Sequence, residues 1–287
     1  MKKIKIIGIG IAIALFLTSF AIAEQTTIDK EETKSGVSLD VDAPVWGVGD
    51  SWTYKMEYYA GDEHGNLLYT FACDLTLTVV DDTGDSYMLE GTGDSVSGRG
   101  IFEGGLEVRL TPFTSAGVEV ELRKSDLAIV QWTHYFKGIT LFILGGFPLP
   151  MQLELACTSV SDPTWAFIPF PLFDDKTGTL ENTKHLEEHN VWLLWRLIHA
   201  GTTPNHWEGG HPTYTVTEET IGCEAGSYDV FYVNAEIDYD KGGAYYRTYY
   251  AEEIGNIVIG SVHSDWGMTG ETGFEFDFEL LSTTYEA

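Results

Sequence analysis

The sequence predicts a mainly β protein: a strongly curved antiparallel sheet, forming an unclosed half-barrel, with one amphipathic helix packed across its concave face. Three observations lead to this fold class. Apolar and polar residues alternate with a period of two along about ten segments. Turns rich in glycine and aspartate separate these segments. One further segment, 181–200, follows the helical period, and its apolar stripe would be covered by the apolar face of a sheet.

The alternation starts after Pro44 and continues almost to the end of the chain. Residues 52–58 place Trp52, Tyr54, Met56 and Tyr58 on one side, and residues 67–80 place Tyr69, Phe71, Cys73, Leu75 and Leu77 on one side. In the last segment, 274–280, Phe274, Phe276, Phe278 and Leu280 point inward and every intervening residue is acidic. Similar segments lie between, at 106–110, 118–122, 128–136, 151–157, 213–218, 228–239, 244–251 and 256–263. This pattern is typical of antiparallel sheet with one wet face.

Two apolar stretches, 138–151 and 165–173, are rich in proline. Proline has no amide hydrogen for a strand ladder, so the prolines at 148, 150, 163, 169 and 171 argue against central strands here. We expect loops that pack over the sheet or cap it.

The segment from Glu181 to Ala200 predicts the helix. Its apolar residues cover one side at about 100° per residue, and Gly201 is a natural stop. The apolar side comprises Leu186, Val191, Leu193, Leu194, Leu197 and Ile198.

The same segment contains the pattern H-x-x-E-H, which is the inverted zinc-peptidase signature. On a helix, His185 and His189 would face one way and could bind a metal, with Glu188 as general base. Against this reading, no local sequence marks a third ligand, and Arg196 lies on the same stripe. A solvated or pocket-lining polar face is therefore preferred, and no metal or other cofactor is predicted.

The chain divides into three parts by composition. Residues 1–23 have a basic start, an apolar stretch and a small-x-small site ending at Ala23, which predicts a cleaved secretory signal; an uncleaved N-terminal membrane anchor is the alternative. Residues 24–43 are polar and acidic and should form a flexible leader. Residues 44–287 form a single β-rich domain. The expected location is secreted, or on the extracytoplasmic surface.

The chain is strongly acidic. Its formal net charge is −28, and cleavage after Ala23 would remove three lysines and no acid, giving −31. Such a surface repels nucleic acid, which excludes it as a partner. The three cysteines, Cys73, Cys157 and Cys223, form no C-x-x-C pair. Cys73 and Cys157 lie at core-facing positions, so buried thiols are expected, with one disulfide bridge as the alternative.

Other candidate site residues have simpler explanations. His206 and His211 lie in a turn-rich stretch and should face water, although they could join a metal site. His134 alternates with Trp132 and Phe136, which predicts a core histidine. The stretch 238–243 begins like a calcium loop, but its twelfth position is Tyr249, so a hairpin turn is preferred. The sequence contains no nucleophile elbow, phosphate-binding loop or dinucleotide fingerprint.

Aromatic residues are abundant, with eight tryptophans, fifteen tyrosines and fifteen phenylalanines. If the helix does not fill the hollow of the curved sheet, the remainder would be an apolar pocket for a lipid-like or other hydrophobic molecule. The candidate ligand-binding residues are then on the helix: Trp192, Leu193, Trp195 and Leu197.

Three stretches are PVWGVGDSWTY at 44–54, GCEAGSYDVFYV at 222–233 and YYAEEIGNIVI at 249–259. In this order they resemble the half-barrel proteins of the lipoprotein-carrier superfamily (LolA- and LppX-like) and their uncharacterised secreted relatives. The chain departs from them at Cys223 and Glu224, where relatives tend to have Val-Pro, and in a longer middle, 138–212. The resemblance implies an unclosed barrel around helical segments, with a hydrophobic concavity that holds acyl chains or other lipids. It implies no catalytic residue.

The sequence therefore predicts a non-catalytic extracytoplasmic protein that binds a hydrophobic ligand or an envelope protein partner. The alternatives are a metal-dependent hydrolase using His185, Glu188 and His189, and a structural component of the cell envelope.

Overall fold

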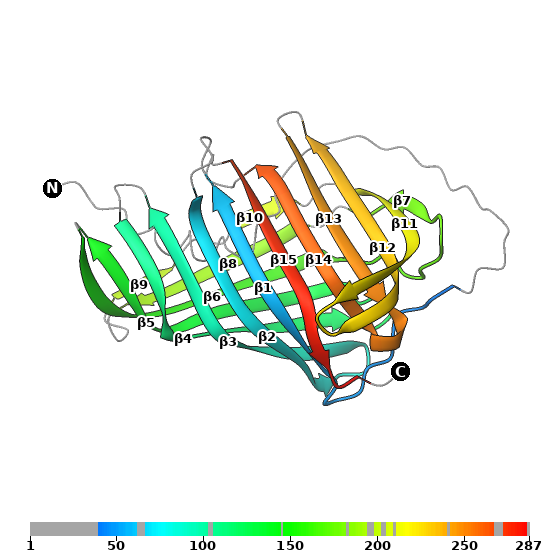
Figure 1. Ribbon diagram of the computed structural model, residues 1–287, viewed down its shortest axis with the longest axis horizontal. Helices are drawn as coiled ribbons and strands as arrows, with labels where there is room; N and C mark the ends of the chain where they lie inside the picture. Colours follow the sequence, from blue (N-terminus) through cyan, green and yellow to red (C-terminus); the bar gives the residue numbers. More distant parts are fainter. Residues whose placement is uncertain are drawn as a thin grey trace.

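The computed structural model describes residues 40–285 except 62–66, 103–105, 145, 182–183, 194–197, 202–204, 209–210, 240–241 and 267–271. In these residues the chain forms one antiparallel sheet of 15 strands and a single 3-10 turn, η1 (Glu252–Ile254). Figure 1 shows the strands side by side along the length of the molecule. The mainly β, antiparallel class predicted from the sequence is confirmed.

The strands are β1 (Ser51–Gly61), β2 (Leu67–Asp82), β3 (Ser86–Phe102), β4 (Leu106–Arg123), β5 (Ile129–Leu144), β6 (Phe147–Trp165), β7 (Thr177–Thr179), β8 (Lys184–Leu193), β9 (Ile198–Gly201), β10 (Asn205–Glu208), β11 (Thr213–Cys223), β12 (Gly226–Tyr239), β13 (Gly242–Ala251), β14 (Asn256–Trp266) and β15 (Thr272–Thr283).

The first and last strands pair with each other inside the sheet. The order is β10-β8-β6-β5-β4-β3-β2-β1-β15-β14-β13-β12-β11-β7, with β9 paired to β8. Two meanders therefore spread from the β1–β15 pair, one toward β8 and one toward β11. Among the described strands, those at the two ends of this order do not pair with each other, so the sheet is unclosed, as predicted.

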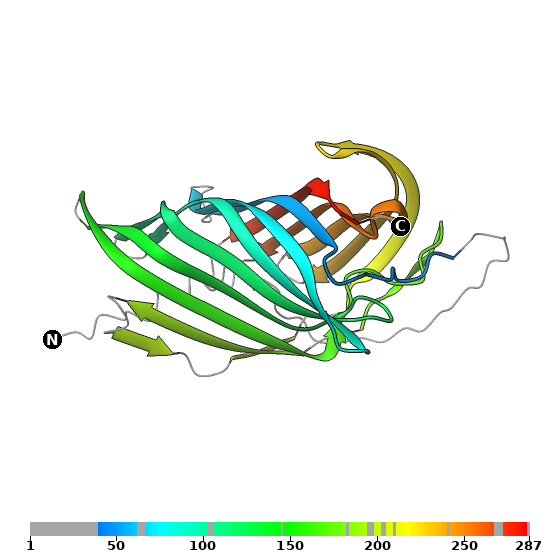
Figure 2. The same cartoon turned by 90° about the horizontal axis from the view of Figure 1, so that it is seen from below.

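Curvature turns this sheet into a trough. Figure 2 shows the sheet bent along its length, and Figure 1 shows β8 and β10 passing behind β1, β15 and β14. The wall that contains β4, β5 and β6 thus faces the wall that contains β1, β15, β14 and β13. The right-handed twist between neighbouring strands favours such curling in a large sheet.

Cross-strand register places the predicted inner residues in rows. Met56 lies opposite Cys73 on one side and Phe278 on the other. Tyr58 in the same way lies between Phe71 and Phe276. Directly opposed residues in an antiparallel ladder share a face, so these rows form a continuous apolar inner surface. The inward assignments made from the period of two are confirmed for β1, β2 and β15.

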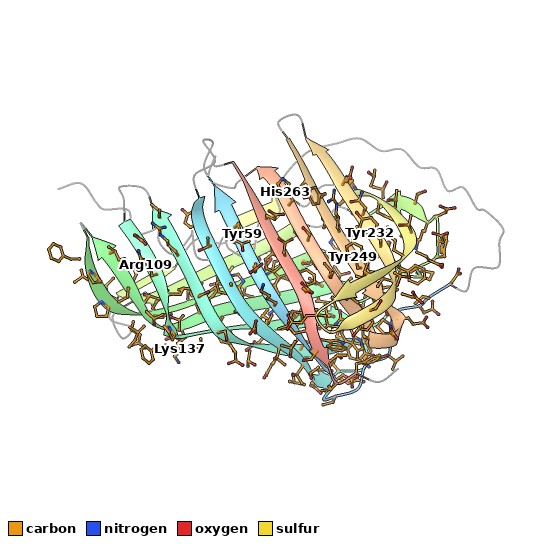
Figure 3. The ribbon with its side chains drawn as sticks, viewed as in Figure 1. Tyr59, Arg109, Lys137, Tyr232, Tyr249 and His263 are labelled. Carbon is orange, nitrogen blue, oxygen red and sulfur yellow. The ribbon has the colours of Figure 1, made fainter. Side chains whose placement is uncertain are left out.

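The outer face is polar and aromatic. On β13, buried residues alternate with partly exposed Tyr245, Arg247 and Tyr249. Tyr249 stacks on Tyr232 of β12, with ring centroids 4.6 Å apart, and Tyr245 stacks on His263 of β14 at 4.9 Å. Figure 3 labels Tyr232, Tyr249 and His263 on these neighbouring strands. The stacked rings link three strands on the side away from the trough.

Three aromatic side chains tie the start of the chain to the β13–β14 connection. The indole nitrogen of Trp46 donates to the carbonyl oxygen of Gly255 at 2.9 Å, and that of Trp52 to Ile254 O at 2.8 Å. The hydroxyl of Tyr54 donates to Ile257 O at 3.0 Å. All three aromatic residues are buried in one apolar cluster at this end of the sheet.

An irregular segment after β6, residues 166–176, caps the same end of the trough. Ile168 and Leu172 are buried against Tyr250, and Phe170 meets the ring of Tyr250 edge-on at 5.2 Å. Val41 and Leu172 exchange two backbone hydrogen bonds of 2.8 Å, so the residues just before Pro44 contribute to this core. The prediction that 165–173 is a capping loop is confirmed from residue 166 onward.

The predicted helix over 181–200 is wrong. The described residues of this segment form β8 and β9, and β8 pairs with β6 from Leu153 to Asp162. Without β8, this length of β6 would expose an unpaired row of backbone amides and carbonyls. Pairing of that edge outweighs a local apolar pattern that fits a helix.

The prediction of a loop at 138–151 is also wrong, because β5 and β6 run through the described residues there. Pro148 and Pro150 pair with Ile143 and Leu141 of β5, but β8 reaches β6 only from Leu153. In the described part of the chain, these prolines therefore lie where one side of β6 has no partner strand, which is where a strand accepts proline.

All three cysteines are free thiols, and Cys73 and Cys157 are buried as expected. The part of the chain that the structure describes has no helix long and apolar enough to cross a membrane.

We expect Trp52→Phe to destabilise the fold by about 2–3 kcal/mol, because it leaves a cavity and removes the donor to Ile254 O. Urea unfolding measures this loss. The control is Tyr59→Phe, where the side chain is 39% exposed and the change should stay within about 0.5 kcal/mol. If the two variants are equally stable, the contacts of Trp52 with the β13–β14 connection do not stabilise the fold.

Candidate functional site

A two-lobed cavity lies inside the trough. One lobe has a volume of about 270 Å³ and the other about 230 Å³. Both are lined by Met56, Leu77, Val120, Phe167 and Phe278, so they are adjacent parts of one hollow. Together they fall within the size range of small-molecule pockets, about 300–1,000 Å³.

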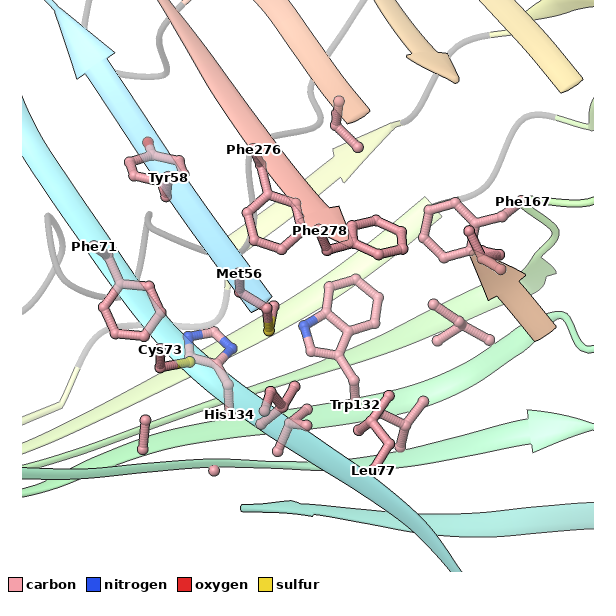
Figure 4. A pocket seen from close by; sticks show the side chains of 18 of the residues that line it. Met56, Tyr58, Phe71, Cys73, Leu77, Trp132, His134, Phe167, Phe276 and Phe278 are labelled. Atoms are coloured by element: carbon pink, nitrogen blue, oxygen red, sulfur yellow. The ribbon is translucent and has the colours of Figure 1, made fainter. Parts of the chain in front are cut away.

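Both walls of the curved sheet contribute to the lining. In Figure 4, Phe276 and Phe278 of β15 lie across the hollow from Trp132 and His134 of β5. The remaining lining side chains of the larger lobe come from β1, β2, β4, β5, β13, β14 and the capping segment. They include Tyr58, Phe71, Cys73, Leu75, Ala116, Val118, Ile129, Tyr246, Thr248, Ile257 and Val262.

The described lining residues include no lysine, arginine, aspartate or glutamate. Polar groups are few: Tyr58, His134, Tyr246 and Thr248 line the larger lobe and are buried, and Asn256 lines the smaller lobe. Burial raises the pKa of the Cys73 thiol to about 12, so this thiol is uncharged at neutral pH. The cavity can therefore hold apolar matter and offers it a small number of neutral hydrogen-bonding groups.

Glycines on the inner face allow large rings to lie flat against the sheet. A Cβ added to Gly260 of β14 would lie 2.0 Å from the ring of Phe278, which is its partner residue on β15. A Cβ added to Gly91 of β3 would lie 2.5 Å from Val118. Small residues at these positions let the neighbouring side chains lie close to the sheet, which leaves the centre of the trough open.

The predicted metal residues lie on β8. The backbones of His185 and His189 pair with Ser161 and Cys157 of β6. Residues four apart on a strand are about 13 Å apart, and a residue three positions away is on the other face. The spacing that would join His185, Glu188 and His189 on a helix therefore separates them here, and Glu188 is exposed.

Of the predicted ligand residues, the structure describes the side chain of Trp192 and the backbone of Leu193. Trp192 pairs with Glu154, on the face opposite to buried Leu153 and Leu155, and does not line the cavity. The backbone of Leu193 pairs with Leu153 at the end of β8. Trp195 and Leu197 lie outside the described residues.

Among the other candidates, His134 is fully buried, as predicted, and lines the cavity. His211 is exposed, and the backbone of His206 pairs with Leu186. Tyr239 and Gly242 pair across the β12–β13 hairpin, as expected for 238–243. Within the described ranges, no group of three histidine, cysteine or acidic residues could hold a metal.

The sequence predicts the cavity residues as inward-facing and an apolar pocket in the hollow, but it places the candidate ligand residues on the helix. Met56, Phe71, Leu75, Phe276 and Phe278 belong to strands whose inner faces the period of two identifies correctly. They were assigned to contact with a helix. The helix prediction therefore moved the candidate site from the sheet to residues 192–197.

Comparison with known proteins gives little further information. No model of a known protein family matches the sequence, and no curated protein matches it. One solved structure is similar: a Parabacteroides distasonis protein provisionally described as a lipoprotein, with 10% identity, 83% of this chain and 96% of that chain covered, and a TM-score of 0.25. This score is too low to support an argument. Membership in the lipoprotein-carrier superfamily stays a prediction.

We expect Gly260→Ala to destabilise the protein by about 1–2 kcal/mol, because the new methyl group forces the ring of Phe278 away from the sheet. Gly222→Ala is the control, since a Cβ there meets nothing within 4 Å. Chemical denaturation measures both. In a Phe278→Leu background the cost of Gly260→Ala should shrink; an unchanged cost would contradict the contact.

In the native protein at pH 8, we expect iodoacetamide to modify Cys223 quickly and Cys73 and Cys157 slowly. Cys223 is partly exposed, whereas the other two are buried and the raised pKa of Cys73 leaves almost no thiolate. Mass spectrometry of peptides after timed labelling measures this. Labelling of Cys73 at the rate of Cys223 would show that the trough opens readily, and Cys223→Ser identifies the fast site.

Proposed function

We propose that this protein binds a small hydrophobic molecule in the hollow of its curved sheet and carries out no chemistry on it. The observation that carries the proposal is the two-lobed cavity, which is lined from both walls by aliphatic and aromatic side chains. Apolar surface in contact with water is unfavourable at about 25 cal/mol per Å². A ligand that covers this lining would be held mainly by this effect.

Rigid supports around the cavity favour a preformed site. The hydrogen bonds of Trp46, Trp52 and Tyr54 to backbone carbonyls hold the start of β1 in place. In the capping segment, Lys176 donates to the carbonyl oxygen of Pro171 at 2.7 Å. A site that is already shaped loses less conformational entropy when the ligand binds. Phe167 of the capping segment lines both lobes, so the cap itself would contact the ligand.

The place of action that we propose is outside the cytoplasm. Residues 1–23 have the basic and apolar character of a secretory signal, and the acidic outer surface suits a protein that stays dissolved at high concentration. A protein partner in the cell envelope would then deliver or receive the ligand. N-terminal sequencing of secreted material tests the location, with cleavage after Ala23 as the expected result.

Organic extraction of the purified native protein, followed by mass spectrometry, tests for a natural ligand. A single class of apolar molecule at close to one equivalent per chain supports binding.

We expect Val120→Trp to lower the affinity for N-phenyl-1-naphthylamine, an uncharged apolar fluorophore, by at least about tenfold, because Val120 lines both lobes. Fluorescence titration of the delipidated protein measures binding. Val160→Trp is the matched control, since Val160 is 39% exposed on a strand and does not line the cavity. If the wild-type protein does not bind the fluorophore, or if both variants bind it equally well, the cavity is not the binding site.

A further inference from the structure

We propose that the ligand is neutral and carries an oxygen that forms a hydrogen bond with the hydroxyl of Thr248. This inference rests on the proposed function and concerns the same cavity. It names the class of ligand, such as an alcohol or a ketone with an apolar body, and it names the residue that selects it.

Thr248 presents a buried polar atom to an apolar hollow. It lies on β13 between Val233 of β12 and Gly260 of β14, and its side chain lines the larger lobe. The residue is only 4% exposed. Among the described residues its Oγ1 atom has no hydrogen-bond partner. Buried hydroxyls are nearly always paired, so this one calls for a partner inside the cavity.

The neighbouring inner residues of β13 make one wall of the trough polar. Tyr246, Thr248 and Tyr250 alternate along the strand and are all buried, so their side chains share the inner face. The hydroxyl of Tyr250 is also buried and, within the described part of the chain, has no hydrogen-bond partner. Successive inner residues are about 7 Å apart, which suits a single oxygen rather than an extended polar headgroup.

Strands β2 and β4 offer a ligand almost only hydrocarbon, while β5 adds the polar groups of Trp132 and His134. On β2 and β4 the lining consists of Phe71, Cys73, Leu75, Leu77, Ala116, Gly117, Val118 and Val120. A molecule with an oxygen on one side and an apolar body could satisfy Thr248 and cover this lining in one orientation. In apolar pockets, a small number of polar groups generally fixes the orientation of the ligand in this way.

The charge of the lining argues against a carboxylate ligand. The described lining residues of both lobes include no lysine or arginine. An anion held there would lose its hydration without gaining an opposite charge, which is far more costly than burying a neutral oxygen. A neutral ligand is therefore favoured over a fatty acid anion of the same length.

The test uses three probes of equal chain length that displace N-phenyl-1-naphthylamine from the full mature protein: 1-decanol, n-decane and decanoate. Each is titrated against wild type, Thr248→Val and Thr248→Ser. Valine has the shape of threonine without the hydroxyl, and serine keeps the hydroxyl. We expect wild type and Thr248→Ser to bind 1-decanol at least about tenfold more tightly than decanoate at pH 8.

In Thr248→Val, the affinity for 1-decanol relative to n-decane should fall by about fivefold to tenfold, the value of one hydrogen bond. The unfolding midpoint of this variant should stay unchanged or rise, because the lost hydroxyl has no partner in the described protein. An unchanged ratio for 1-decanol and n-decane would overturn the inference and leave apolar binding intact. Preferential binding of decanoate would also overturn it. Failure of all probes and of the fluorophore would instead refute the proposed function.

Discussion

The apolar face of a sheet has to be removed from water, and in the described chain no second layer does this. The only helical element among these residues is the 3-10 turn Glu252–Ile254. The sheet therefore becomes its own partner: curvature brings the wall of β4, β5 and β6 over the wall of β1, β15, β14 and β13. Pairing of β1 with β15 makes this possible, because it joins two meanders into one surface with a common inner face.

The sequence predicted this inner face well, because in a strand the side-chain period depends only on backbone geometry. Phe276 and Phe278 point into the hollow, as their alternation with acidic residues indicated. The helix prediction for 181–200 was wrong, since the ten-residue segment that forms β8 has scattered apolar side chains that fit both periods. The choice between them depends on the free edge of β6, which is a tertiary feature. The same edge explains why Pro148 and Pro150 could not be interpreted from sequence: in the described residues β8 pairs with β6 from Leu153 to Asp162, and both prolines lie before this length of β6.

The three stretches that resemble lipoprotein carriers meet at one end of the sheet. The indole of Trp52 bonds to a carbonyl 202 residues further along the chain, and Trp46 to one 209 residues away. Val230 and Tyr228, from the stretch at 222–233, join the same apolar cluster. Sequence analysis can identify such aromatic and glycine motifs as structural, but their contact is set by the strand order. Long-range contacts of this kind help to hold the first strand in the register that aligns Met56 and Tyr58 with Phe278 and Phe276 of β15.

A trough of this kind need not contain a cavity, and the difference depends on residue size on its inner face. Gly260 lies against the ring of Phe278, and Gly91 lies against Val118 and Leu77, so these neighbours can lie close to the sheet and the centre is left open. No periodic pattern in a sequence reports that balance of volumes, which is why the cavity-lining residues could be predicted as inner residues but not as the ligand-binding residues.

Charged and uncharged polar groups are also separated between the two faces of the sheet. Acidic groups occupy the wet face, where they keep the protein dissolved, while the hollow contains neutral hydroxyls on β13 against hydrocarbon on β2 and β4. The charged groups lie on the outer face, and the inner face carries only uncharged hydrogen-bonding groups among the described lining residues. The sheet can therefore be highly acidic and still hold an uncharged molecule.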